Sequence, residues 1–177
     1  MSCYIRPQRP GATIFFTLCL ARQGDDLLVA RIDALRAAFR ATMSDYPFRI
    51  EACVILPDHL HCIWTLPPQD CEFAMRWRLI KGRFVQGLDP RPRSRSKRRK
   101  SEKGIWQRRF WEHHIRDAGD FARHVAYCHQ DPVRHGLVAQ AACWPYSTIH
   151  RHEQGAGIPV VPVAAERAGE FPAGAAS

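Results

Sequence analysis

Two histidines separated by one residue, His59 and His61, have a spacing that can bind a metal ion. They lie in HLHCIWTL, residues 59–66, which is predicted to be a strand because apolar residues alternate along it. The side chains expected to point into a core are Leu60, Cys62, Trp64 and Leu66. Both imidazoles then fall on the opposite, solvent-facing side, within reach of one divalent cation. Two surface histidines on a half-exposed strand are the alternative interpretation.

A tyrosine and an aspartate further along the chain could complete this site. Tyr127 and Asp131 in RHVAYCHQDP share one face of a helix predicted to begin after Asp117 and to end at Pro132. The core-facing residues of this helix are expected to be Phe121, Val125 and Cys128. If the helix crosses the open face of a sheet, Asp131 adds a carboxylate to the histidines, and the Tyr127 phenol beside the ion can attack a phosphodiester. The alternatives are a half-buried aromatic and a helix-terminal acid.

Hydrophobic periodicity predicts the elements that position these residues. Strands are expected over residues 13–20, 49–56, 59–66 and, with ambiguous alternation, between 106 and 116; helices over 25–44, from an N-cap at Asp70 to about 84, and after Asp117. Pro57-Asp58 joins the second and third strands as a hairpin. The order β-α-β-β-α-β plus a helix predicts an α+β, ferredoxin-like antiparallel sheet with that helix on its open face. Residues 1–152 are expected to form one domain, and the Ala/Gly/Pro-rich residues 153–177 a poorly ordered tail.

The positive charge of the chain is concentrated in one segment. Residues 91–103 contain eight lysines and arginines and one glutamate, and so carry +7 of the net charge of +9. A basic loop over residues 87–104 without an apolar face favours nucleic acid over a membrane as its partner. The sequence has no apolar run long enough to span a bilayer, and no glycine-rich loop for a nucleotide cofactor.

The cysteines fit neither a disulfide framework nor a zinc site. There are seven, an odd number, and none forms a CxxC pair. Reduced, mostly buried thiols are expected, as is typical of cytoplasmic proteins.

Four segments together resemble the REP-associated tyrosine transposases, bacterial relatives of the single-tyrosine, HUH-type insertion-sequence transposases. They are VILPDHLHCIWTLP, IWQRRFWEHHIRD, HVAYCHQDPVRHGLV and WPYSTIHRH, and the resemblance covers about residues 6–152. It implies a Mg²⁺ or Mn²⁺ cofactor and cleavage and transfer of single-stranded DNA through a 5′-phosphotyrosine. The metal-binding histidines of the family match His59 and His61, and its nucleophile matches Tyr127. Asp131 stands where relatives usually have Asn or Gln, and an aspartate still offers an oxygen ligand.

The resemblance also implies a substrate and a setting. Family substrates are repetitive extragenic palindromes (REPs) in bacterial DNA, recognised as a hairpin with a few unpaired bases, so a cytoplasmic, nucleoid-associated monomer or homodimer is expected. Candidate DNA contacts are Arg93, Arg95, Lys97, Arg98, Arg99, Lys100, Trp106, Arg109, Arg134 and His135. Trp106 and Trp111 could each stack on a base or pack in the core.

Two other functions are consistent with parts of the sequence. A non-catalytic binder of single-stranded nucleic acid could use the same fold, although the strands lack the aromatic signature of RNA-recognition domains. A metallohydrolase acting on a small substrate is disfavoured by the basic loop and by the absence of an apolar pocket motif.

Overall fold

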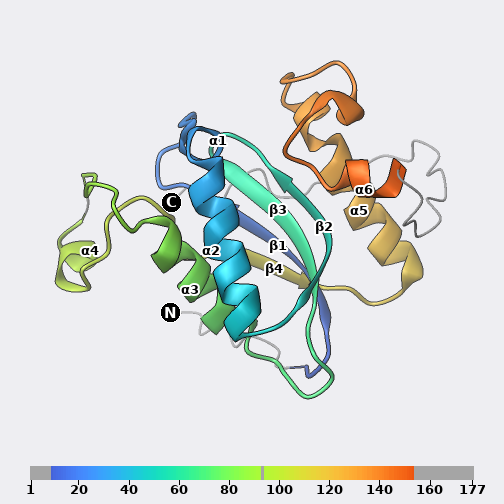
Figure 1. Cartoon of the computed structure of the whole chain (residues 1–177), viewed down its shortest axis with the longest axis horizontal. Helices are drawn as coiled ribbons and strands as arrows, with labels where there is room; N and C mark the ends of the chain where they lie inside the picture. Colours follow the sequence, from blue (N-terminus) through green and yellow to red (C-terminus); the bar gives the residue numbers. More distant parts are fainter. Residues whose placement is uncertain (1–8, 93, 154–177) are drawn as a thin grey trace, which may run out of the picture.

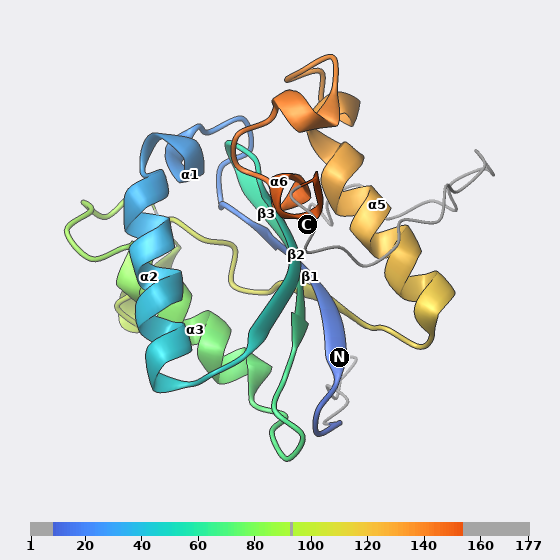
Figure 2. The ribbon, with the colours of Figure 1, turned by 45° about the vertical axis from the view of Figure 1, so that its right-hand side comes forward.

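The computed structural model describes residues 9–92 and 94–153, and it has a four-stranded antiparallel sheet with helices on both faces (Figures 1 and 2). The strand order is β2-β3-β1-β4, which confirms the predicted ferredoxin-like arrangement. The elements are β1 Thr13–Cys19, α1 Leu27–Ala30, α2 Ile32–Asp45, β2 Arg49–Ile55, β3 His59–Thr65, α3 Phe73–Phe84, α4 Arg95–Arg99, β4 Trp111–His114, α5 Ala118–Arg134, a 3-10 turn Ala141–Cys143 and α6 Ile149–Glu153. Arg93 and, beyond residue 153, the predicted tail lie outside the described residues.

Two hydrophobic cores lie on the two faces of the sheet. The larger core packs α2 and α3 against alternate residues of β1 and β3, and it includes Phe16 of β1, Trp64 of β3 and Trp77 of α3. The smaller core lies under α5 and contains Phe15, Ile63, Val125 and Cys128 among others. Because strand side chains alternate between faces, residues adjacent in sequence, such as Phe15 and Phe16, contribute to different cores. The predicted apolar faces of β3 and of α5 are confirmed.

Strand β2 departs from simple alternation. A register shift between Ile50 and Ala52 in its pairing with β3 marks a β-bulge at Glu51. Ile50 therefore packs against the larger core, whereas Ala52 and Val54 lie in the smaller one. Unbroken alternation would place Ile50, Ala52, Val54 and Leu56 on one face; the extra residue at the bulge reverses the alternation and moves Ile50 to the other face.

The helix predicted over residues 25–44 is divided into α1 and α2 at Arg31. Helix α3 begins after Glu72 rather than after the predicted N-cap Asp70. The Asp70 carboxylate accepts from the backbone N–H of Glu72 at 2.7 Å and from the buried Arg76 guanidinium at 2.6 and 3.0 Å, and so serves as the counter-ion that a buried guanidinium requires.

Helix α5 does not end at Pro132 but continues to Arg134. Proline has no backbone N–H, so Pro132 removes one hydrogen bond of the helix. Near the C-terminus of α5 this loss is small enough for the helix to continue for two more residues. Asp117 caps the start of α5 as predicted, because its carboxylate accepts from the backbone N–H of Asp120 at 2.8 Å.

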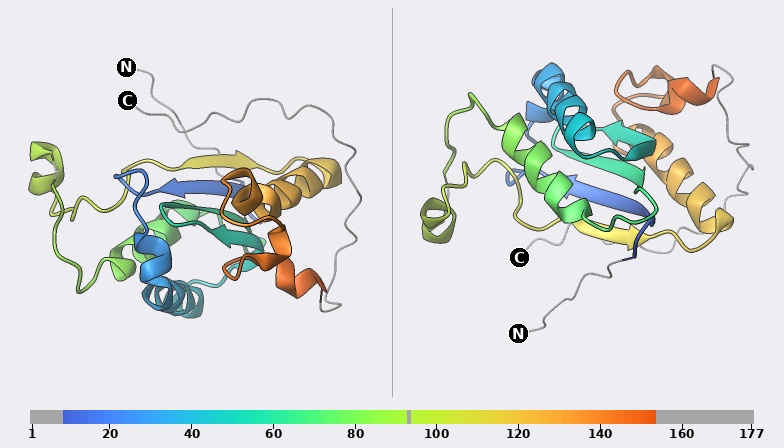
Figure 3. Two further views of the ribbon diagram at one scale, coloured as in Figure 1. Left: turned by 90° about the horizontal axis from the view of Figure 1, so that it is seen from above. Right: turned by 60° about the horizontal axis from the view of Figure 1, so that its bottom comes forward.

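The basic segment is not entirely a loop. It contains α4, which Ser94 caps, and it extends away from the sheet as an arm (Figures 1 and 3). Lys103 donates to the carbonyl of Leu88 at 2.6 Å, and Lys97 donates to that of Trp106 at 3.3 Å. These two cations thus hold the base of the arm. None of the helices described is long and apolar enough to cross a membrane.

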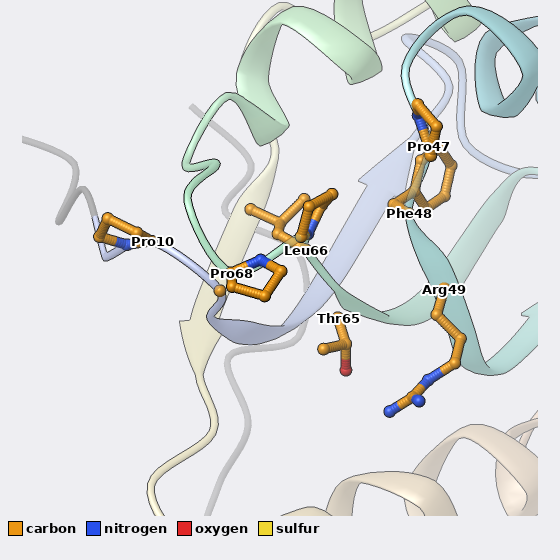
Figure 4. A pocket seen from close by; sticks show the side chains of 9 residues that line it. Pro10, Pro47, Phe48, Arg49, Thr65, Leu66 and Pro68 are labelled. Atoms are coloured by element: carbon orange, nitrogen blue, oxygen red, sulfur yellow. The ribbon is translucent and has the colours of Figure 1, made fainter.

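A shallow groove of about 640 Å³ lies where β3 ends, away from His59 (Figure 4). Its walls are formed largely by prolines, with Phe48, Arg49 and Thr65 between them. No carboxylate, imidazole or thiol lines it. It is therefore not the site that the sequence predicts.

Candidate metal and tyrosine site

The predicted ligands meet on the open face of the sheet beneath α5. The Nε2 atoms of His59 and His61 lie 3.3 and 3.2 Å from the same oxygen, Oδ2 of Asp131. Ligands in adjacent positions around an ion at about 2.1 Å are themselves about 3 Å apart, so each imidazole nitrogen is suitably spaced from the Asp131 oxygen to share a divalent cation with it. At this site, the ligand atoms that all lie within 4.8 Å of one another are those of His59, Asp131 and His135, and His61 is not in that group. The structure thus brings together residues from β3 and α5 that are 72 positions apart in sequence.

The second ring nitrogen of His59 and of His61, Nδ1, is hydrogen-bonded to another side chain of the protein. Nδ1 of His59 donates to Oδ1 of Asp58 at 2.6 Å, and Nδ1 of His61 lies 2.8 Å from Oγ1 of Thr17. Such partners orient an imidazole and leave Nε2 as the nitrogen that can bind a cation. The sequence analysis did not assign Asp58 or Thr17 to the site. Asp58 lies next to the motif, but Thr17 reaches it only through the pairing of β1 with β3.

The charges at this site are strongly coupled. Burial opposes ionisation of Asp131, but hydrogen bonds from His59 and His61 lower its pKa below the ordinary value. Burial also disfavours the charged form of His59, yet bonds to Asp131 and Asp58 outweigh burial and raise its pKa. In His61, burial dominates and lowers the pKa. Asp131 is therefore an anion facing two imidazoles.

His61 is buried, with 4% of its surface exposed, so the expectation that both imidazoles face solvent is wrong for this residue. Its ring stacks on Phe15 at 5.5 Å and is covered by Tyr127. The reason is that α5 packs over this face of the sheet, an arrangement that the strand pattern alone does not reveal.

Tyr127 lies on the same face of α5 as Asp131 and points to the histidines. Its ring centroid is 5.1 Å from that of His61 and 5.9 Å from that of Phe15. The guanidinium of Arg134 lies 4.6 Å from the ring. Burial and the Asp131 carboxylate raise the pKa of Tyr127, and Arg134 opposes this shift.

His135 is a further candidate ligand that the sequence analysis treated only as a DNA contact. Its Nε2 lies 3.7 Å from Oδ2 of Asp131, and its ligand atom, that of His59 and that of Asp131 lie within 4.8 Å of one another. His135 is half exposed at the rim of the site. The sequence could have indicated this, because His135 follows Asp131 by four residues and such residues are neighbours on a helix surface.

The predicted DNA contacts fall into distinct places. Arg109 and Arg134 are exposed, the latter beside Tyr127. Trp106 is buried against Phe84, so core packing is the alternative that holds for it. The exposed cations of the arm are Arg95, Arg98, Arg99 and Lys100.

A second histidine–carboxylate cluster lies nearer the start of α5. Asp120, which is 1% exposed, accepts from Nε2 of His113 on β4 at 2.8 Å and lies 3.3 Å from Nδ1 of His124. It also pairs with Arg116 and Arg123, each at 3.1 Å. With these partners around its two oxygens, Asp120 links α5 to the edge of the sheet. Burial opposes its ionisation, but bonds from His113 and Arg116 lower the pKa of its carboxyl well below the ordinary range.

Fold and site together define a class: a ferredoxin-like sheet with paired histidines on a central strand and a tyrosine on a helix across its open face. The chain is 44% identical over 151 residues to the REP-associated tyrosine transposase of Escherichia coli strain K12, covering 85% of this chain and 84% of that protein. It is 42% identical over 153 residues to a putative REP-associated tyrosine transposase of Haemophilus influenzae, covering 85% and 87%. The chain belongs to the REP-associated tyrosine transposase family.

The tertiary structure agrees with this assignment. A solved structure of a REP-associated tyrosine transposase bound to a REP hairpin superposes with a TM-score of 0.81 at 40% identity, covering 98% of this chain and 97% of that one. A scan against models of known protein families finds no match.

Proposed function

We propose that this protein cleaves and rejoins single-stranded DNA at REP hairpins, with Tyr127 as nucleophile and a Mg²⁺ or Mn²⁺ ion held by His59, His61 and Asp131. One observation carries the proposal: the Nε2 atoms of two imidazoles converge on a single carboxylate oxygen, and the ring centroid of Tyr127 lies 5.1 Å from that of one of these imidazoles, His61. A relative with the same fold is known bound to a REP hairpin, which supports the same substrate here. The setting we propose is the bacterial cytoplasm, at the nucleoid.

The proposed reaction is a transesterification at phosphorus. The phenolic oxygen of Tyr127 forms a bond to phosphorus as the bond to the 3′-oxygen breaks. The phenol loses its proton, and the departing oxygen gains one to become a 3′-hydroxyl. The strand is then joined to Tyr127 through its 5′-phosphate, and attack by a free 3′-hydroxyl reverses the step.

The side chains around Tyr127 divide the remaining tasks. When bound, a divalent cation would neutralise the scissile phosphate and stabilise the phenolate. Arg134, over the tyrosine ring, can contact a phosphate and opposes the rise in the Tyr127 pKa. The exposed cations of the arm, Arg95, Arg98, Arg99 and Lys100, suit contacts along the DNA backbone.

The test uses labelled hairpin oligonucleotides with unpaired flanks, incubated with the full chain and either Mn²⁺ or EDTA and resolved under denaturing conditions. We expect an SDS-resistant adduct with Mn²⁺ only, lost in Tyr127→Phe and retained in Tyr46→Phe, an exposed tyrosine that follows α2. Tight hairpin binding without an adduct in any metal would replace this proposal with a non-catalytic DNA-binding protein.

A further inference from the structure

Trp111 is an exposed aromatic on the face of the sheet that carries the candidate site. Its side chain is 39% exposed, in contrast to that of Trp106, which is 7% exposed. Trp111 begins the edge strand β4 and pairs across β1 with Thr17, which in turn pairs with His61. Directly paired residues point to the same face, so Trp111 lies two strands, about 10 Å, from His61.

The indole of Trp111 is supported by other rings rather than projecting alone. It is parallel to the His113 ring within 7°, at 5.9 Å, and His113 is parallel to His124 within 14°, at 4.6 Å. Asp120 fixes His113 at 2.8 Å. This ring stack, Trp111–His113–His124, holds the indole in one orientation and so reduces the entropy lost when a planar ligand stacks on it.

A single side chain connects this stack to the candidate nucleophile. Phe15 contacts the edge of Trp111 at 5.7 Å and the ring of Tyr127 at 5.9 Å. Beside the stack, the side chains of Arg116 and Arg123 are 66% and 53% exposed while paired with Asp120. The surface therefore combines an apolar, planar platform with cations at its border, which is the composition that binds an unpaired nucleotide.

We propose that Trp111 is a positioning residue on which an unpaired base next to the scissile phosphate stacks. The stacked base would fix the register of the single strand, so that the adjoining phosphate reaches Tyr127. This inference rests on the proposed function for its substrate, single-stranded DNA flanking a hairpin. A stacked base is read by its aromatic face rather than by its hydrogen-bonding edge, so the platform favours position over sequence.

The test measures binding of fluorescently labelled hairpins with unpaired flanks to the full chain in EDTA, where cleavage does not contribute. Trp111→Ala is expected to weaken binding roughly 10-fold, and Trp111→Phe to recover most of the loss. Tyr46→Ala removes a comparably exposed aromatic elsewhere, at 42% exposure, and should leave binding unchanged.

A series of hairpins with one abasic nucleotide at each flanking position identifies the stacked base. At that position, the abasic hairpin should bind wild type and Trp111→Ala equally, because each change already removes the same contact. Additive losses at all positions, or unchanged binding by Trp111→Ala, would overturn the platform. If the losses are non-additive at one position but the protein forms no adduct with Mn²⁺, the stacking role of Trp111 stands and the proposed nuclease activity is rejected.

Discussion

At the scale of single residues, Asp131 determines the charge of the candidate site. An amide at this position would be neutral, whereas this chain places a carboxylate 3.2 and 3.3 Å from two imidazoles. The carboxylate raises the pKa of His59 and contributes to raising that of Tyr127. It thus provides a stronger cation ligand, but it opposes ionisation of the nucleophile.

We expect Mn²⁺ binding to weaken by about 10-fold per pH unit once the pH falls below the pKa of His59. The ion must displace one proton: His59 has a raised pKa, whereas the lowered pKa values of His61 and Asp131 leave these two groups in their ligating forms. Titration calorimetry from pH 8 to pH 5 measures this slope. Asp131→Asn should move the onset to lower pH, and an affinity independent of pH would contradict the assignment of His59.

At the scale of elements, α5 is attached to the sheet near both ends. Asp120 binds His113 of β4, and Asp131 binds both histidines of β3, with Tyr127 between them on the same side of the helix. Residues 120, 124, 127 and 131 follow each other by three or four positions, so they form one polar stripe toward the sheet. Because α5 is attached to the sheet at both points, it cannot easily rotate about its axis, and the phenol of Tyr127 is held in place.

Asp120→Asn is expected to destabilise the protein by about 1–3 kcal/mol at pH 7. The folded-state pKa of Asp120 is lowered, so its contribution is full above the unfolded value of about 3.9 and is lost as the pH falls through the folded pKa. Urea unfolding of wild type and variant should therefore show a smaller difference at pH 3.5 than at pH 5 or 7. Asp33→Asn, in a pair whose side chains are 93% and 49% exposed, is the control expected to change stability little. A deficit that does not depend on pH would contradict the ionic role.

The arm is the second element with a separable task. Replacing its exposed cations Arg95, Arg98, Arg99 and Lys100 with Gln should weaken hairpin binding and reduce the dependence of log affinity on log salt by about 2 to 3. The matched control replaces four exposed arginines elsewhere: Arg22, Arg31, Arg40 and Arg78. Equal effects of the two variants on the salt dependence would show that net charge, not the arm, attracts the DNA.

At the scale of the whole molecule, one chain supplies every residue of the candidate site. Tyr127, His59, His61 and Asp131 converge within a single copy, so the proposed reaction requires no second subunit. The base of the basic arm lies at the same end of the sheet as His59, because Leu20 bridges Trp106 and the neighbouring Cys19 pairs with His59, so one nucleic acid could reach both.

Mixtures of Tyr127→Phe and His59→Ala are therefore expected to form no adduct, although each variant retains the part that the other lacks. The adduct yield per wild-type molecule should also stay constant on dilution. Recovery of adduct in the mixture, measured by denaturing gels, would show that tyrosine and histidines act across two subunits.

The sequence by itself was sufficient for the fold class and for the three candidate ligands and the tyrosine. Alternation in β3 separates His59 and His61 from the apolar residues, and helical spacing places Tyr127 beside Asp131, because both patterns depend only on local backbone geometry. Where a side chain's partner or burial depends on contact between elements distant in sequence, only the tertiary structure determined it. Strand pairing brings Thr17 within hydrogen-bond distance of His61, and α5 buries His61. Asp120 accepts a hydrogen bond from His113 across the turn between β4 and α5. The bulge at Glu51 and the burial of Trp106 but not Trp111 belong to the same group, because side-chain exposure depends on which element packs above it.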